Sequence, residues 1–132
     1  MTNKKRINQK LNAKVVIMAG GKGTRLDPLT KILPKPLLPI NDKAIIEHIT
    51  SRFIKYGIND FYFTIRHKMK IIKAYFNDSK PNYKIRYLEE KKPLGTAGGL
   101  KKLQGKIKDN FFVTNCDVLI DANLPDFYNF HK

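Results

Sequence analysis

Residues 15–40 read VVIMAGGKGTRLDPLTKILPKPLLPI and decide the fold. The first five, Val15 to Ala19, form a continuous apolar run rich in β-branched side chains, and the run stops at Gly20. This pattern is typical of a strand that is buried on both faces, as in a parallel sheet. Residues 20–40 contain three glycines and four prolines, which predicts a long loop without regular structure.

Strands and helices alternate in the rest of the chain. The pattern predicts strands at 60–65, 84–88 and 111–114, and helices at 44–56, 68–76, 96–104 and from 124 onward. In the first helix, apolar residues such as Ile46, Ile49 and Phe53 recur every three to four positions, and Gly57 is placed to end it. Such alternation predicts an α/β fold with a mostly parallel sheet.

The composition narrows the class of protein. With 132 residues, 42% hydrophobic and 28% charged, the chain is one domain or part of one. No apolar run approaches the roughly 20 residues of a membrane span, and the polar start is unlike a secretory signal. The single cysteine, Cys116, excludes an internal disulfide framework and a multi-cysteine metal site. We expect a reducing, cytoplasmic setting and no membrane partner.

The chain is strongly basic. It has 26 Lys and Arg against 11 Asp and Glu, a formal net charge of +15. This balance favours a polyanionic partner such as a nucleic acid or a phosphorylated ligand. Heavy use of Lys, Asn and Ile throughout equally favours a compositional bias of the source genome. Residues 1–13 are predicted to form a basic arm or linker.

The loop after the first strand has phosphate-binding chemistry. Glycines allow the backbone to approach a phosphate closely, and Lys22 and Arg25 add positive charge. The loop matches neither the P-loop nor the dinucleotide-binding pattern. Prolines at 34, 36 and 39 stiffen the following segment, so Lys35 is expected to be held in place beside the glycines.

The stretch from Ala19 to Ile40 closely resembles the signature of the sugar-1-phosphate nucleotidylyltransferases, the pyrophosphorylases that make nucleotide sugars. Residues 89–100 (EEKKPLGTAGGL) are similar to the family's nucleotide-base segment, and residues 111–117 (FFVTNCD) to its strand ending in a metal-binding aspartate. The resemblance covers residues 14–132. It implies a Rossmann-like three-layer α/β/α fold, truncated after about the first half, and an amino-terminal nucleotide-binding part of the catalytic domain.

The resemblance also implies the site residues. Arg25, Lys35 and Asp117 would be catalytic: the two cations neutralise the triphosphate and pyrophosphate, and Asp117 coordinates Mg²⁺. The reaction would be in-line attack by a sugar phosphate oxygen on the α-phosphorus, which needs charge neutralisation and alignment. The nucleotide-binding set would comprise Ala19, Gly20, Gly21, Gly23, Thr24, Arg25, Lys35, Glu90, Gly95, Thr96, Ala97 and Gly98.

Plainer roles remain open for several of these residues. Asp117 is also suited to capping the segment that follows it, and Glu89 and Glu90 to a solvated strand end. Cys116 is expected to pack as a small buried side chain, and His48 to be a structural residue of its helix.

Within the family, the segment PLGTAGGL looks most like the guanylyltransferases for mannose, heptose or related sugars. GTP is therefore the favoured substrate, with UTP, CTP and dTTP open. Family members continue well past this length and carry a second metal-binding carboxylate and most of the sugar pocket there. We therefore expect little turnover by the chain alone, and self-association or a completing chain. The alternatives are a non-catalytic nucleotide-binding or regulatory subunit and, less favoured, a nucleic-acid-binding module.

Overall fold

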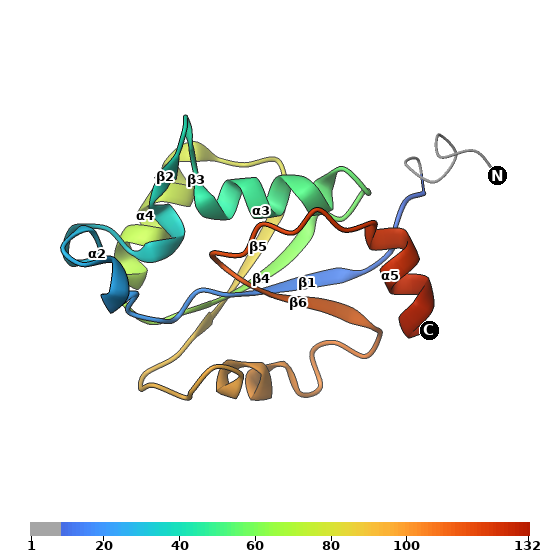
Figure 1. The fold of residues 1–132 in the computed structure, drawn as a ribbon. Coiled ribbons are helices and arrows are strands. Elements are labelled where there is room, and N and C mark those ends of the chain that lie inside the picture. The colour runs from blue at the N-terminus through green and yellow to red at the C-terminus, as the bar shows by residue number, and fades with distance from the viewer. Residues whose placement is uncertain (1–8) are drawn as a thin grey trace.

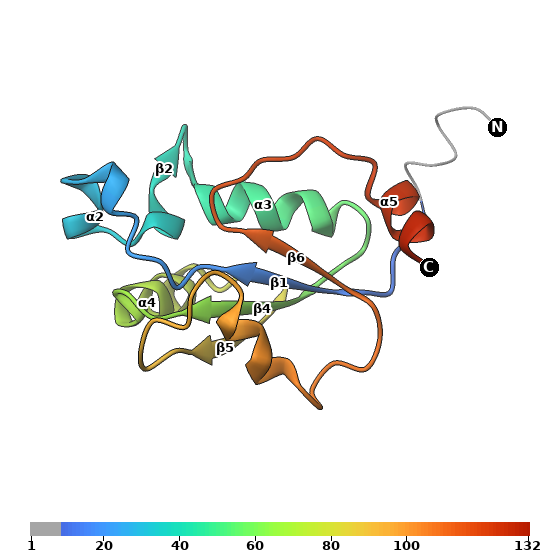
Figure 2. The ribbon, with the colours of Figure 1, turned by 60° about the horizontal axis from the view of Figure 1, so that its bottom comes forward.

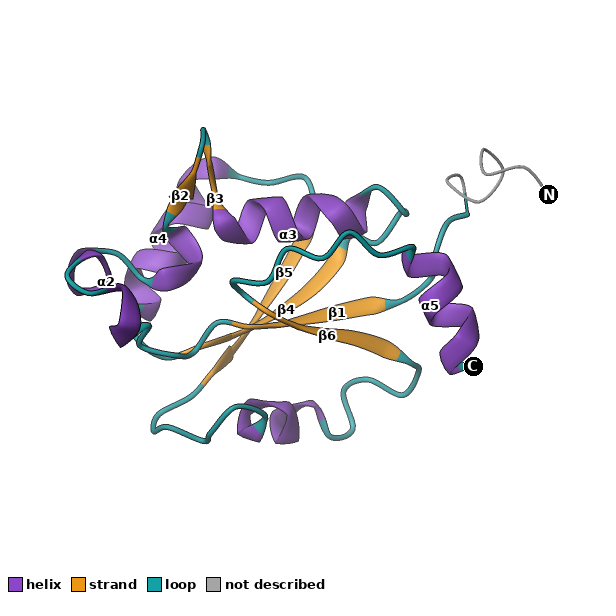
Figure 3. Cartoon of the chain, viewed as in Figure 1, coloured by secondary structure: helices purple, strands orange, loops and turns teal. Residues whose placement is uncertain are grey.

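The computed structural model describes residues 9–132, whose centre is a four-stranded sheet with every strand parallel (Figures 1 and 3). Its strands are β1 (Lys14–Met18), β4 (Asp60–Ile65), β5 (Lys84–Glu89) and β6 (Phe111–Asn115), in the order β5-β4-β1-β6. The four predicted strands are therefore confirmed to within a residue or so at their ends. The predicted basic arm, residues 1–13, lies mostly outside the described residues.

Helices lie against both faces of the sheet. Figure 1 shows α3 (Ile45–Ile54) and α4 (Met69–Ser79) on one side of the strands and the short 3-10 helix η3 (Gly98–Leu103) on the other. The last helix, α5 (Leu124–His131), lies beside β6, and Asn123 caps its first turn. The predicted three-layer α/β/α arrangement is confirmed, although the segment predicted as a helix at 96–104 contains only the 3-10 helix Gly98–Leu103.

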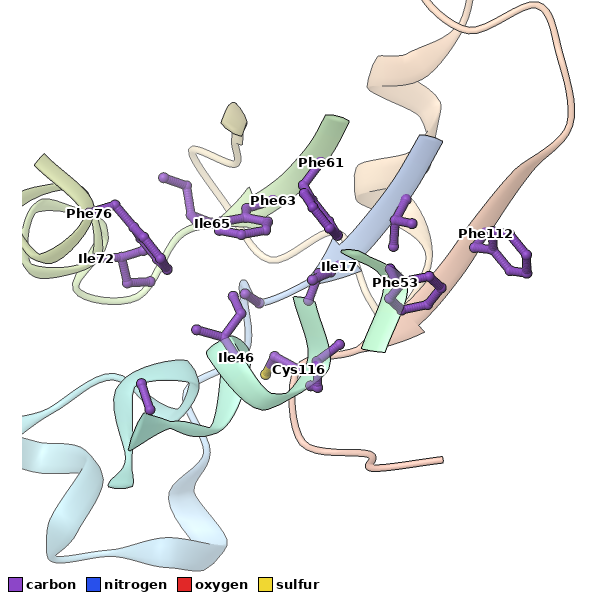
Figure 4. Close-up of a cluster of buried hydrophobic side chains, with 14 of the residues drawn as sticks. Ile17, Ile46, Phe53, Phe61, Phe63, Ile65, Ile72, Phe76, Phe112 and Cys116 are labelled. Atoms are coloured by element: carbon purple, nitrogen blue, oxygen red, sulfur yellow. The ribbon is translucent and has the colours of Figure 1, made fainter. Parts of the chain in front are cut away.

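The core lies mainly between the sheet and α3 and α4 (Figure 4). Alternate residues of the central strands point to opposite faces: Val15 and Ile17 enter this main core, whereas Val16 packs under η3 with Leu103. Burial on both faces is the reason why residues 15–19 are continuously apolar. Phe63, fully buried in β4, is surrounded by the rings of Phe61, Phe76 and Tyr87.

The proline-rich segment contains more regular structure than the sequence predicts. Two 3-10 turns (Thr24–Leu26 and Lys35–Leu37), one α-helical turn, α2 (Leu29–Ile32), and a two-residue antiparallel pair, β2 (Pro39–Ile40) with β3 (Lys43–Ala44), occupy it. The prediction of a loop without regular structure was therefore wrong. Proline is compatible with the first turn of a helix, because a backbone N–H at that position would have no partner within the helix.

One edge of the sheet is open. In the described part of the chain, β6 pairs only with β1. A cavity of about 570 Å³ lies between α3, β6 and α5. Several large apolar side chains that line it are exposed, namely Val113, Val118, Leu119, Ile120 and Phe127. Self-association of the chain through this edge stays a prediction.

Among the described residues, no helix is long and apolar enough to cross a membrane.

Candidate nucleotide-binding site

The carboxyl ends of the four strands lie at the same end of the sheet, as the arrowheads in Figure 2 show. The loops that follow these strands line a cavity of about 580 Å³. Ligands bind at this end in open α/β sheets. Nine of the predicted site residues line the cavity, namely Gly20, Gly21, Gly23, Arg25, Lys35, Glu90, Gly95, Thr96 and Asp117.

The other four predicted residues do not line this cavity. The backbone N–H of buried Ala19 donates to the Thr64 carbonyl at 2.9 Å and so anchors the start of the glycine-rich loop to β4. Thr24 is exposed in the first 3-10 turn, and Ala97 and Gly98 stand at the start of η3. A Cβ on Gly98 would lie 2.4 Å from the Cβ of Leu94, so this glycine allows the loop to close up.

Gly23 joins the glycine-rich loop to the proline-rich segment. Its φ of +66° is in the left-handed region that favours glycine. A Cβ there would lie 3.1 Å from both the Cβ of Lys35 and the Cγ2 of Thr30. Buried Thr30 also places its hydroxyl 3.0 Å from the Gly23 carbonyl and 2.6 Å from an Asp27 carboxylate oxygen. This packing fixes the stem of Lys35 against the loop.

Lys35 and Asp117 form an ion pair across the cavity. The Lys35 Nζ lies 2.6 Å from the Asp117 Oδ2, and both side chains are partly exposed. Within residues 9–132, no group of three or more His, Cys, Asp and Glu side chains is placed to hold a metal ion. Mg²⁺ usually takes only one or two carboxylates plus substrate phosphates, so Asp117 fits the role of its protein ligand.

Glu90 is buried, with only 6% of its surface exposed. Its carboxylate lies between two glycines: a Cβ on Gly99 would be 2.3 Å from its Oε1, and a Cβ on Gly20 would be 3.3 Å from its Oε2. Among the described residues, this carboxylate has no hydrogen-bond or ion-pair partner. The alternative of a solvated strand end was therefore wrong for Glu90. It is right for Glu89, which is exposed and pairs with Lys73.

The structure adds two residues that the sequence analysis did not single out. Arg66 lines the cavity directly after β4, and Gly99 contacts the Glu90 carboxylate. The rule that ligands bind at the ends of parallel strands points to Arg66, because the strand at 60–65 is predicted correctly. No signal in the sequence indicates the contact of Gly99.

Cys116 and His48 have structural roles, as predicted. Cys116 is part of the main core, and the His48 Nε2 lies 2.8 Å from the Ile40 carbonyl oxygen. Burial, with a contribution from the neighbouring Asp117 carboxylate, raises the pKa of the Cys116 thiol to about 11. Since the thiolate is the nucleophile, this cysteine is unsuited to covalent catalysis at neutral pH.

We expect Cys116 to react slowly with a disulfide reagent in the folded protein. At pH 8, a thiol pKa near 11 in place of 9.0 lowers the thiolate fraction about 100-fold. The rate of reaction with a disulfide dye should therefore be at least that much lower in buffer than in denaturant. Equal rates in the two solvents would show that Cys116 is accessible.

Comparison with known proteins identifies the family. The model of the nucleotidyl transferase family matches residues 14–132. The chain belongs to this family. The resemblance predicted from the signature is thus confirmed, and with it the α/β nucleotidyltransferase fold.

Two curated relatives of the nucleotidyltransferase chain are guanylyltransferases. The D-glycero-alpha-D-manno-heptose 1-phosphate guanylyltransferase of Campylobacter jejuni is 40% identical over 109 residues, which are 83% of this chain and 49% of the relative. The mannose-1-phosphate guanylyltransferase of Mycobacterium tuberculosis is 40% identical over 119 residues, 89% of this chain and 33% of the relative. The chain thus spans between a third and a half of their length.

Solved structures share the fold. HddC from Yersinia pseudotuberculosis, complexed with GMP-PN, aligns with a TM-score of 0.77 and 29% identity over 89% of this chain and 53% of that one. A putative glucose-1-phosphate thymidylyltransferase from Bacillus anthracis aligns with a TM-score of 0.79 at 24% identity, over 90% of this chain and 50% of that one. At this identity the second structure supports the fold alone.

Proposed function

We propose that this chain is the nucleotide-binding part of an enzyme that transfers a nucleotidyl group from GTP to a sugar 1-phosphate and releases pyrophosphate. The observation that carries the proposal is the single cavity at the strand ends, which contains Arg25, Lys35, Glu90 and Asp117. Two relatives at 40% identity, named as guanylyltransferases, support it. A cytoplasmic location fits the single, buried cysteine.

Guanine suits the Glu90 carboxylate better than the other bases do. A carboxylate only accepts hydrogen bonds, and guanine carries two adjacent donors, N1–H and the N2 amino group. Uracil and thymine present one N–H between two carbonyl oxygens, which a carboxylate repels. Glu90 is mostly buried and has no partner among the described residues, so its carboxylate, on the lining of the cavity, is available to accept from a ligand with matching donors.

The other charged residues suit the triphosphate. The Arg25 guanidinium can bind two phosphate oxygens, and the Lys35 ammonium neutralises charge on the leaving pyrophosphate. Asp117 would hold Mg²⁺, which supplies charge neutralisation and alignment of the phosphates. In-line transfer requires no covalent intermediate, which agrees with the inert Cys116. The second metal carboxylate and the sugar pocket are expected in the part of the relatives that this chain does not span.

A panel of thermal melts tests this proposal. The chain is melted with Mg²⁺ and each of GTP, UTP, CTP and dTTP, together with Arg25→Ala and Glu90→Gln. At ten times its Kd, GTP should stabilise the chain by about 1.4 kcal/mol, a shift of a few degrees. The other three nucleotides should stabilise it less. The Arg25 variant should lose the shift with every nucleotide, and the Glu90 variant should lose the preference for GTP.

Glu89→Gln is the matched control for the Glu90 variant. Glu89 precedes Glu90 in the chain but is exposed, so its substitution removes the same charge and should leave the preference for GTP intact. Equal shifts with all four nucleotides would contradict the assignment of guanine. A cooperative melt that no nucleotide moves would contradict the nucleotide site itself.

A further inference from the structure

Arg66 lies next to Glu90 at the carboxyl ends of the strands. In the parallel pairing of β4 with β5, Ile65 is level with Glu89. The Glu90 backbone N–H donates to the Ile65 carbonyl at 2.9 Å, so the first residues after the two strands, Arg66 and Glu90, are neighbours. Adjacent strands are about 4.8 Å apart. Both residues line the strand-end cavity.

Within residues 9–132, the Arg66 guanidinium has no hydrogen-bond or ion-pair partner. Of the arginines in residues 9–132, Arg52 bonds Asp121 and Arg86 bonds Asp60, and both lie outside this cavity. Arg25 and Arg66 line the cavity and make no hydrogen bond or ion pair with any described residue. Arg66 is partly buried. Its guanidinium, on the lining of the cavity, is therefore available to donate to an acceptor on a ligand.

Arg66 and Glu90 do not neutralise each other. Their charges are opposite, yet no nitrogen of Arg66 lies within 4 Å of a Glu90 oxygen, since the structure records no ion pair between them among the described residues. An acceptor-only group and a donor-only group therefore stand side by side, each free to bind the same ligand.

We propose that Arg66 binds the O6 and N7 atoms of guanine while Glu90 accepts from N1–H and N2. This inference rests on the proposed function and extends it to a specificity-determining residue outside the family's signature stretch. A guanidinium fork matches O6 and N7 in a bidentate pair, which is the commonest specific contact of arginine with guanine. O6 is adjacent to N1 on the guanine ring. One base can therefore present O6 and N7 to Arg66 after β4, and N1–H and N2 to Glu90 after β5.

The proposal assigns different discriminations to the two residues. Adenine carries an amino group where guanine has O6, so Arg66 excludes ATP. Pyrimidines have no N7 acceptor. Inosine lacks only the N2 amino group and loses a contact with Glu90, whereas 7-deazaguanine lacks only the N7 acceptor and loses a contact with Arg66.

Ligand binding by the wild-type chain and two variants tests the proposal. The Kd values of GTP, ITP, 7-deaza-GTP, UTP and inorganic triphosphate are measured with Mg²⁺ by calorimetry for the wild-type chain, Arg66→Met and Arg66→Lys. The wild type should bind 7-deaza-GTP about fivefold more weakly than GTP, as expected for the loss of roughly half of a bidentate contact. Arg66→Met should bind GTP roughly 5- to 150-fold more weakly and no longer distinguish GTP from 7-deaza-GTP. Arg66→Lys, which keeps the charge but lacks the fork, should also lose that distinction.

Two controls make the result specific. Arg86→Met removes the same charge from an arginine outside the cavity and should keep the wild-type ratio of GTP to 7-deaza-GTP. In every Arg66 variant the ratio of GTP to ITP should persist, because it depends on Glu90. If Arg66→Met weakens GTP, UTP and inorganic triphosphate equally and keeps the 7-deaza ratio, Arg66 binds phosphate and the proposal is overturned. If the wild type binds none of the nucleotides, the proposed function fails, and this inference fails with it.

Discussion

Replacing Phe63 by alanine should lower the free energy of unfolding by about 3–5 kcal/mol, the range measured for large aromatic side chains in cores. Phe63 is fully buried. Its ring centroid lies 5.4 Å from that of Phe76 in α4 and 6.2 Å from that of Tyr87 in β5. The substitution therefore leaves a cavity where α4 packs on the sheet. Since small domains are stable by only about 5–15 kcal/mol, this loss is a large fraction of the total stability.

Urea denaturation of the wild-type and variant chains measures this loss. Phe130→Ala is the matched control, because Phe130 is 91% exposed and its removal should change stability by less than about 0.5 kcal/mol. Both variants replace a phenylalanine by alanine, so the difference between their losses of stability measures the effect of burial at position 63. A loss below 1 kcal/mol in Phe63→Ala would mean that α4 does not pack on β4 as described.

Gly99→Ala should weaken GTP binding by at least about tenfold, the affinity equivalent of 1.4 kcal/mol. The added Cβ would lie 2.3 Å from the Glu90 Oε1 and 3.0 Å from the Thr64 Cγ2. The carboxylate is the flexible end of a side chain, so it moves, and the chain remains folded. Its displacement removes the acceptor that we assign to guanine, while the triphosphate residues stay in place.

A double variant separates this displacement from a general disturbance of the loop. In a Glu90→Ala background the carboxylate is absent, so adding Gly99→Ala should cost little further affinity. Calorimetric Kd values for the four chains give the coupling between the two positions. Additive losses would show that Gly99 acts on the nucleotide through a route other than Glu90.

The strands were predictable because the signal that defines them is local. A run such as Val15 to Ala19 is apolar at every position, because Val15 and Val16 enter different cores on the two faces of the sheet. The parallel arrangement follows from the alternation of strands and helices. The edge at which the site lies then follows from the direction of the strands. Nine of the predicted site residues were accordingly placed around one cavity.

Contacts between distant segments were not predictable. The burial of Glu90 depends on Gly20, which is 70 positions earlier, and on Gly99 in the next element. No pattern of spacing encodes that contact, and a pair of glutamates at a strand end looks the same whether solvated or enclosed. The short helical turns within residues 24–37 were missed for a similar reason, since the Thr30 hydroxyl and its partners at Gly23 and Asp27 help to stabilise them.

The 2.6 Å contact between Lys35 and Asp117 couples the binding of the nucleotide to the binding of the divalent cation. The ammonium group is a counter-ion tethered to the chain, so it competes with any dissolved cation for the carboxylate at a high effective concentration. A triphosphate that draws Lys35 toward itself releases Asp117. Nucleotide and divalent cation should therefore assist each other's binding, and either one alone should bind more weakly than in the presence of the other.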